Sequence, residues 1–172
     1  MDRGDQSSSK PNPNAPAELH RFAFLIGTWR CEAKVNLPDE TWQVFQGSWI
    51  GQYILDGYVI ADEYRMSASS GEVIVLGMNF RTFDAAERRW HIKWLNALTG
   101  TWVDLVSEEL GGIRFDGHSI IYAFKEPVAA HVYTRATYTN ISENHFTWRG
   151  EKSDDQKTWS EFMVVEVYRT NE

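Results

Sequence analysis

The chain has 172 residues, which is enough for one domain with a full hydrophobic core. Its net charge of −7 argues against nucleic acid or an anionic membrane surface as the main partner. The single cysteine, Cys31, excludes an intramolecular disulfide, and no stretch is apolar and long enough to cross a bilayer. The N-terminus lacks the apolar core of a signal peptide, so we expect a cytoplasmic protein.

The N-terminal region divides into a tail and a short helix. Residues 1–16 are polar and rich in proline, which predicts a disordered tail before a single domain over residues 17–172. Pro16 suits the first turn of a helix, because its missing N–H costs nothing there. The apolar residues that follow are spaced by three and four, which predicts a short amphipathic helix with one apolar face, formed by Leu19, Phe22, Ala23 and Ile26.

The first strand comes directly after this helix. Gly27 allows a sharp change of direction, because glycine tolerates a positive φ. Beyond it, apolar and polar residues alternate strictly, which is typical of a strand with one buried and one solvated face. The apolar face carries Trp29, Cys31, Ala33 and Val35, and the polar face carries Arg30, Glu32 and Lys34.

From residue 41 onward, strand signals alternate with turn signals at intervals of roughly 8–12 residues. Turns are indicated at Asp56-Gly57, Thr99-Gly100, Gly111-Gly112 and Asp116-Gly117, and a longer connection at Glu126-Pro127-Val128. Short connections between about ten strands predict an antiparallel up-and-down sheet. With only one helix available to cover sheet edges, we expect an all-β fold closed into a barrel.

Several segments carry a family resemblance. They are Gly27-Thr28-Trp29, Leu55-Asp56-Gly57-Tyr58-Val59, Asn79-Phe80-Arg81-Thr82-Phe83-Asp84, Arg89-Trp90-His91-Ile92-Lys93-Trp94 and Val167-Tyr168-Arg169. Their order resembles the bacterial DUF1579 family, and the opening resembles lipocalin-like (calycin) β-barrels. The resemblance spans about residues 18–170 and brings no activity with it. It implies a structural signature in which Arg169 packs across Trp29 beside Gly27; the alternative is a solvated Arg169.

Alternation along the other strands predicts an aromatic barrel interior with a few polar groups. An apolar cavity with a handful of orienting polar side chains is the usual composition of a small-molecule site. The residues that we expect to contact such a ligand are Tyr64, Trp94, Asn96, Tyr133, Arg135, Trp148 and Met163. An outward Arg135 is an equal alternative, and the inward faces of residues 101–109 and 131–141 are left open.

Two acidic residues are candidates for catalysis. Asp62 alternates with Ile60 and Tyr64, which favours an inward carboxylate, although the opposite register would leave it in solvent. The direction of Asp104 is undecided, because both faces of its strand are apolar. A buried carboxyl group has a raised pKa and is suited to proton transfer.

Metal and cofactor chemistry have no support in the residue pattern. The five histidines lack metal-ligand spacing and no second cysteine exists, so we expect neither a metal nor a cofactor. A haem barrel of the nitrobindin kind would need a proximal histidine, for which only His131 or His145 is available.

Three functions remain open. The first is binding of a small hydrophobic or aromatic molecule in the barrel lumen. The second is an isomerase, cyclase or dehydratase that uses an inward carboxylate. The third is an assembly module with a filled barrel, and a homodimer is also left open.

Overall fold

The computed structural model describes residues 9–124 and 131–170, so the first eight residues of the expected tail and the connection at 126–128 lie outside it. The described residues form one antiparallel sheet of eleven strands and two 3₁₀ helices. Their bounds are η1 Ala17–Leu25, β1 Gly27–Asn36, β2 Trp42–Ile54, η2 Leu55–Gly57, β3 Val59–Ser67, β4 Val73–Asp84, β5 Arg89–Asn96, β6 Thr101–Asp104, β7 Ile113–Phe115, β8 Ile120–Ala123, β9 Tyr133–Thr139, β10 His145–Ser153 and β11 Ser160–Arg169.

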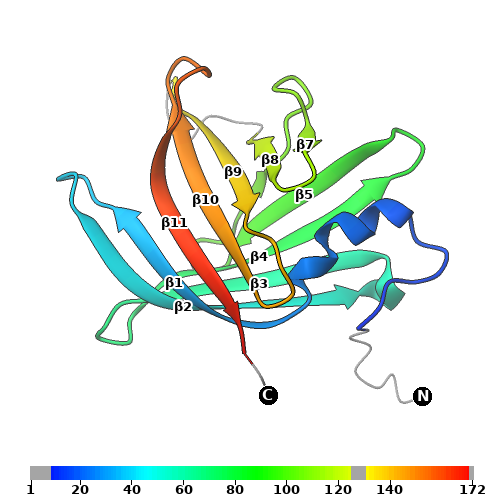
Figure 1. Ribbon diagram of the computed structural model, residues 1–172, viewed down its shortest axis with the longest axis horizontal. Coiled ribbons are helices and arrows are strands. Elements are labelled where there is room, and N and C mark those ends of the chain that lie inside the picture. The colour runs from blue at the N-terminus through cyan, green and yellow to red at the C-terminus, as the bar shows by residue number, and fades with distance from the viewer. Residues whose placement is uncertain (1–8, 125–130, 171–172) are drawn as a thin grey trace.

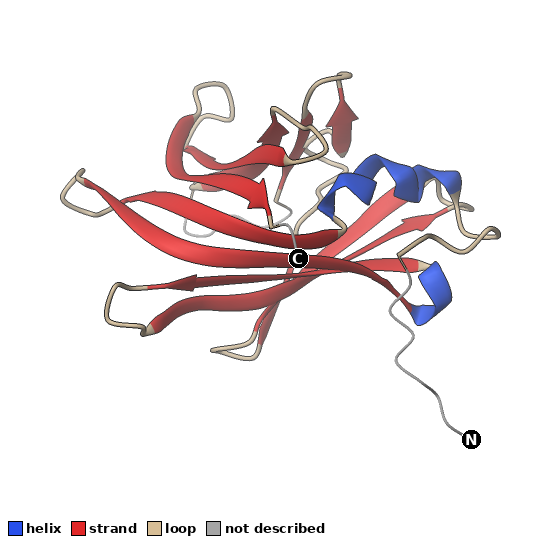
Figure 2. Ribbon diagram, turned by 60° about the horizontal axis from the view of Figure 1, so that its bottom comes forward, coloured by secondary structure: helices blue, strands red, loops and turns tan. Residues whose placement is uncertain are grey.

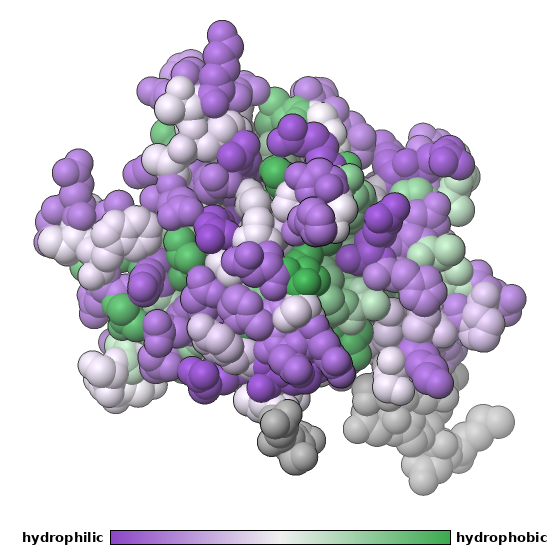
Figure 3. Space-filling model, viewed as in Figure 1, coloured by the Kyte–Doolittle hydropathy of each residue, from purple (hydrophilic) through white to green (hydrophobic). Residues whose placement is uncertain are grey.

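The strand order is β6-β5-β4-β3-β2-β1-β11-β10-β9-β8-β7. Neighbours in sequence therefore pair throughout the described sheet, except for β6 and β7 at its two ends, and β1 joins β11. This is the expected up-and-down topology. The sheet curls strongly, and its concave side encloses the core (Figure 1; Figure 2). The face of the molecule seen in Figure 3 is mostly hydrophilic, with apolar residues in small separate areas.

The end strands β6 and β7 form no ladder with each other among the described residues. The chain after β6 bridges the gap instead. The N–H of Leu105 donates to the carbonyl of Ile92 in β5 at 2.9 Å, and the N–H of Ser107 donates to the carbonyl of Ala123 in β8 at 3.1 Å. The sequence predicts one strand over residues 101–109, but β6 ends at Asp104 because the chain crosses there from β5 to β8.

Helix η1 closes one end of the curled sheet (Figure 1), where it packs against β2, β3 and β4. Its buried residues, Leu19, Phe22 and Leu25, are spaced by three. This is the repeat of a 3₁₀ helix and places one buried residue on each turn. Of the predicted apolar face, Leu19 and Phe22 are fully buried, whereas Ala23 and Ile26 are only partly buried, and Ile26 still packs against the core. Leu25, which the prediction did not include, is the third fully buried residue. Neither η1 nor η2, the two helices of the described chain, could cross a membrane.

The segment that leads into η1 is bound to the turn between β2 and β3, in contrast to the expected disordered tail. The N–H of Asn12 donates to the carbonyl of Gly57 at 3.1 Å, and its side-chain amide donates to the carbonyl of Asp56 at 2.9 Å. This contact attaches at least residues 12–15 to the barrel end, because Ala15 also bonds back to Asn12.

The predicted packing of Arg169 on Trp29 is present at this closed end. The guanidinium lies 3.9 Å from the centre of the indole ring and donates to the carbonyl of Ile26 at 3.0 Å. Gly27 has φ +123, and a Cβ at this position would overlap the Arg169 side chain. Trp29 is almost fully buried, and its indole N–H donates to the carbonyl of Leu25 at 3.0 Å.

Candidate ligand cavity

The interior contains a cavity of about 230 Å³ between the middle of the barrel and the end opposite η1. Fourteen described residues line it: Trp49, Tyr64, Val75, Asn79, Trp94, Leu105, Tyr122, Phe124, Ala136, Tyr138, Trp148, Phe162, Met163 and Val165. Eight of these side chains are aromatic and none carries a charge. Asn79 and the tyrosine hydroxyl groups are therefore the main polar groups available to a ligand.

One wall of the cavity depends on a glycine. Gly77 on β4 pairs with Asn96 on β5, and the ring of Trp94 lies directly across it. A Cβ built at Gly77 would overlap that ring. The missing side chain therefore allows the indole to lie against the sheet and leaves space beside it.

A buried ion pair lies beneath the floor of the cavity, where it bonds to the lining residues Asn79, Tyr122 and Tyr138. Asp62 on β3 and Arg81 on β4 are both fully buried, and Arg81 Nε donates to Asp62 Oδ1 at 2.6 Å. Arg81 Nη2 reaches Asp62 Oδ2 at 3.2 Å, and Asn79 Nδ2 donates to the same oxygen at 2.7 Å. Both carboxylate oxygens of Asp62 are thus bonded, which offsets much of the cost of burying its charge.

Two tyrosines extend this floor across the barrel. Arg81 Nη1 donates to the hydroxyl oxygen of Tyr122 at 3.3 Å, and Nη2 donates to that of Tyr138 at 3.0 Å. Burial opposes the charge on Arg81, but Asp62 and the two tyrosines raise its pKa well above the ordinary value. On the side away from the cavity, the guanidinium lies 4.7 Å from the ring of Phe22 in η1. The floor therefore separates the helix-filled end from the cavity.

The wall formed by β2 and β3 contains two further polar groups. The rings of Trp49 and Tyr64 lie 5.4 Å apart, and both residues are more than nine-tenths buried. Neither the indole N–H of Trp49 nor the hydroxyl of Tyr64 has a hydrogen-bond partner within the described chain. Burial raises the pKa of Tyr64, so its hydroxyl stays protonated.

The structure brings together four of the residues expected at a ligand site, since Tyr64, Trp94, Trp148 and Met163 all line the cavity. Asp62 faces inward as favoured, but it lies beneath the floor and is bonded to Arg81 and Asn79. It is therefore part of an ion pair rather than a free acid.

Three residues expected at the ligand site do not line the cavity. Asn96 is at the end of β5, where its Oδ1 accepts the N–H of Leu98 and shapes the turn to β6. Tyr133 and Arg135 lie on the outer face of β9, because the alternate residues Thr134 and Ala136 take the buried positions. The sequence left the inward face of residues 131–141 open, and the outward Arg135 is the alternative that the structure shows.

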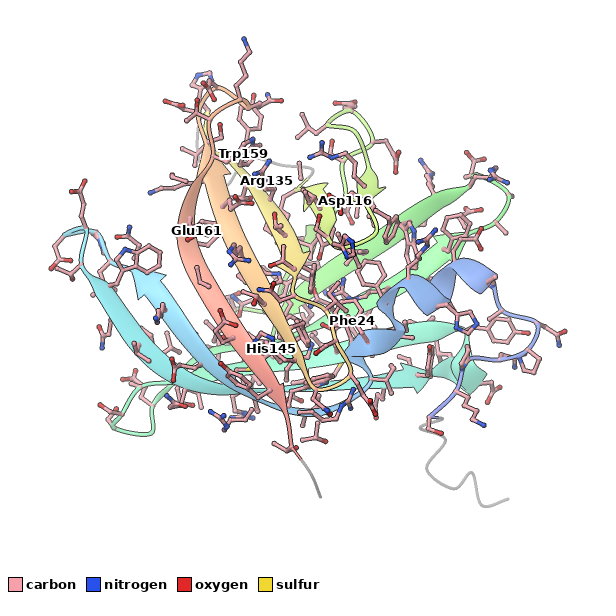
Figure 4. All side chains as sticks on the ribbon, viewed as in Figure 1. Phe24, Asp116, Arg135, His145, Trp159 and Glu161 are labelled. Atoms are coloured by element: carbon pink, nitrogen blue, oxygen red, sulfur yellow. The ribbon has the colours of Figure 1, made fainter. Side chains whose placement is uncertain are left out.

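Arg135 has its own partners on the outside of the barrel. Its Nε donates to Glu151 Oε2 at 2.8 Å, and its guanidinium lies 4.3 Å from the ring centre of Trp159 (Figure 4). Burial acts to raise the pKa of Glu151, but hydrogen bonds from Arg135 and Thr137 lower it below its usual range.

Asp104, the second candidate for catalysis, also lies outside. Its carboxylate is 3.3 Å from Lys93 Nζ, and both side chains are in part exposed to solvent, Lys93 on β5 and Asp104 on the edge strand β6. It is therefore not an inward acid. In the described residues no three histidine, cysteine, aspartate or glutamate side chains are grouped in a way that could hold a metal ion.

Sequence reasoning missed the partners of Asp62. Asn79 and Arg81 are two residues apart on β4, so they share its inward face, and β4 pairs directly with β3. That spacing beside an inward Asp62 is a signal that could have identified the floor. Tyr122 and Tyr138 are 41 and 57 residues from Arg81, and no local pattern connects them to it.

The fold and this cavity define a curled antiparallel β-barrel with an aromatic cavity in its interior. The chain belongs to the DUF1579 family, described as proteins of unknown function, whose model matches residues 15–169. No curated protein matches the chain.

Two solved structures share the fold. Rv2717c from M. tuberculosis aligns with a TM-score of 0.64 at 10% identity, covering 92% of this chain and 100% of that one. A protein of unknown function from the DUF3598 family of Nostoc punctiforme aligns with a TM-score of 0.51 at 11% identity. That alignment covers 86% of this chain and 48% of the Nostoc chain.

Proposed function

We propose that this protein binds one small aromatic molecule in the cavity between Trp94, Trp148 and the floor above the Asp62–Arg81 pair. The observation that carries the proposal is a cavity of about 230 Å³ lined by eight aromatic side chains and no charged one. Aromatic rings in such a lining offer face and edge contacts to a planar ligand.

The volume limits the size of the ligand. An engineered apolar cavity of about 150 Å³ is enough to bind benzene, whereas pockets for drug-sized ligands measure about 300–1,000 Å³. A cavity of about 230 Å³ therefore suits a molecule of one or two rings. Burial of its apolar surface would contribute about 25 cal/mol for each Å² removed from water.

The two other functions have less support. The enzyme alternative needs a carboxyl group that is free to take or give a proton, but Asp62 has both oxygens engaged by Arg81 and Asn79. Asp104 lies outside the barrel. The assembly alternative needs a filled interior, which the cavity argues against.

Fluorescence titration with 1-naphthylamine tests the proposal. This neutral two-ring fluorophore absorbs where tryptophan emits, so binding beside Trp94 and Trp148 should quench the protein emission at one equivalent. Trp94→Ala and Trp148→Ala should each change the Kd, measured from the emission of the probe, by about tenfold, which corresponds to the loss of about 1.4 kcal/mol of contact.

Trp102→Ala is the matched control. Trp102 is the residue before Val103, which pairs with Trp94, and its exposed side chain packs on Phe80 at the outer face. This variant should keep the Kd of the unaltered protein. Quenching that is lost with Trp102→Ala and kept with Trp94→Ala would contradict the cavity as the binding site.

A further inference from the structure

The hydrogen bonds at the cavity floor fix the orientation of the Asn79 amide. A carboxylate can only accept hydrogen bonds, so the amide nitrogen must face Asp62, to which Nδ2 donates at 2.7 Å. The other end of the amide is then the carbonyl oxygen Oδ1. No donor within residues 9–124 and 131–170 bonds to this oxygen, and Asn79 lines the cavity. The floor thus provides one hydrogen-bond acceptor.

The two floor tyrosines provide one donor. A guanidinium only donates, so the hydroxyl oxygens of Tyr122 and Tyr138 both accept from Arg81. These oxygens lie 3.3 Å apart, so the hydrogen of one hydroxyl can be donated to the other. Two hydroxyl groups carry two hydrogens. One O–H is therefore left without an acceptor in the described chain, and both tyrosines line the cavity.

The floor has no charge to offer a ligand. Asp62 and Arg81 neutralise each other, and the described lining contains no other ionic group. A carboxylate or ammonium group entering the cavity would lose its hydration without gaining an opposite charge, which is costly. A purely apolar ligand would leave the free O–H and the amide carbonyl without partners, which is also unfavourable.

We infer that the ligand of this cavity is a neutral hydroxyaromatic molecule of the phenol or naphthol class. Its hydroxyl would donate to Asn79 Oδ1 and accept from the free tyrosine O–H. A hydroxyl group fills both roles with a single heavy atom, which suits a cavity of this size. The inference rests on the proposed function and adds the chemical class of the ligand to it.

Two ligands of the same shape test this inference on the unaltered protein. 2-Naphthol and 2-methylnaphthalene differ by a hydroxyl in place of a methyl group, and their affinities can be measured by displacement of 1-naphthylamine. A plain apolar cavity would favour the methyl compound, because it is the more hydrophobic of the two. We expect 2-naphthol to bind at least about tenfold more tightly. 2-Naphthoate should bind more weakly than 2-naphthol.

A protein variant gives a second readout. Tyr122→Phe combined with Tyr138→Phe removes both floor hydroxyls and with them the donor to the ligand, so the preference for 2-naphthol should fall, while the acceptor Asn79 Oδ1 remains and 2-methylnaphthalene still binds. Tyr133→Phe removes a hydroxyl on the outer face of β9 and should leave the preference unchanged. If the double variant does not fold, the ligand comparison on the unaltered protein decides the question.

The outcomes separate the two proposals. Equal or tighter binding of 2-methylnaphthalene to the unaltered protein would overturn the hydroxyaromatic class, while 1-naphthylamine binding would still support an aromatic site. If 1-naphthylamine itself does not bind, the proposed function fails, and the ligand class falls with it.

Discussion

The indole ring of Trp94 lies across Gly77 of the neighbouring strand, in the space that any other side chain at that position would occupy. The contact places the ring against the wall of the barrel, and the cavity opens beside it. The glycine therefore affects the shape of the binding site without offering a ligand any chemical group.

Gly77→Ala should reduce ligand binding. The added methyl group must displace the Trp94 ring, and overpacking of this kind costs about 1–3 kcal/mol of folding stability. We expect the Kd for 1-naphthylamine to rise by about tenfold or more, the effect of about 1.4 kcal/mol. Leu76→Ala, at the adjacent outward position of β4, should leave the affinity unchanged. Equal affinity of Gly77→Ala and the unaltered protein would mean that the ligand does not occupy this space.

The contact between Trp29 and Arg169 should stabilise the closed end. Trp29→Ala removes a buried aromatic ring and should lower the free energy of unfolding by about 3–5 kcal/mol. Arg169→Ala loses the stacking contact, worth about 0.5–2 kcal/mol, and the hydrogen bond to Ile26. Urea unfolding measures both changes.

Arg30 provides a comparison for Arg169. It lies 4.9 Å from the ring centre of Tyr168 on the solvated face of β1, where such contacts contribute little. Arg30→Ala should change stability by less than about 0.5 kcal/mol. A larger effect for Arg30→Ala than for Arg169→Ala would contradict the structural role of the Trp29 contact.

The Asp62–Arg81 pair should be far more sensitive to losing one partner than to losing both. Asp62→Asn leaves the guanidinium buried without its counter-charge, and such changes cost about 3–5 kcal/mol. Asp62→Leu combined with Arg81→Met replaces the pair by apolar side chains and should cost less than Asp62→Asn alone. Denaturant unfolding of both variants tests this order, and a cost below about 1 kcal/mol for Asp62→Asn would show that the pair is unimportant for folding.

Cys31 should be chemically inert while the protein is folded. Burial raises the pKa of its thiol to about 12, and nearby Arg30 lowers it only in part. Because the folded state holds this proton more tightly than the unfolded state, the stability it contributes is complete below pH 9 and is lost as the pH rises from 9 towards 12. A thiol reagent such as DTNB at pH 8 should react only as fast as the protein unfolds. Immediate reaction would place Cys31 at the surface.

Much of the fold could be predicted from local patterns. Strict alternation around Trp29 identified the buried face of β1, and the spacing of Trp90, Ile92 and Trp94 identified that of β5. Each of these strands has one buried and one solvated face, so apolar and polar residues alternate along its sequence. The resemblance of Gly27, Trp29 and Arg169 to a barrel signature predicted the contact between Trp29 and Arg169, which lie near the two ends of the chain.

The polar part of the site was harder to predict. An arginine in a strand is ordinarily expected on the solvated face. Only the long-range contacts of Arg81 with Asp62 and Tyr138 explain its burial. On β9, Tyr133 and Arg135 have long side chains that pack well on an outer sheet surface, so their chemical character does not reveal the face. Such assignments depend on strand register across the barrel, which local periodicity does not contain.

A crystal grown with 6-bromo-2-naphthol tests the aromatic cavity most directly, because the bromine can be located by its anomalous scattering. The account predicts one bromine peak inside the barrel, near Trp94 and Trp148, with the ring between these residues and the floor above the Asp62–Arg81 pair. An empty interior at saturating ligand, or a single peak on the outer face beside Trp102, would contradict it.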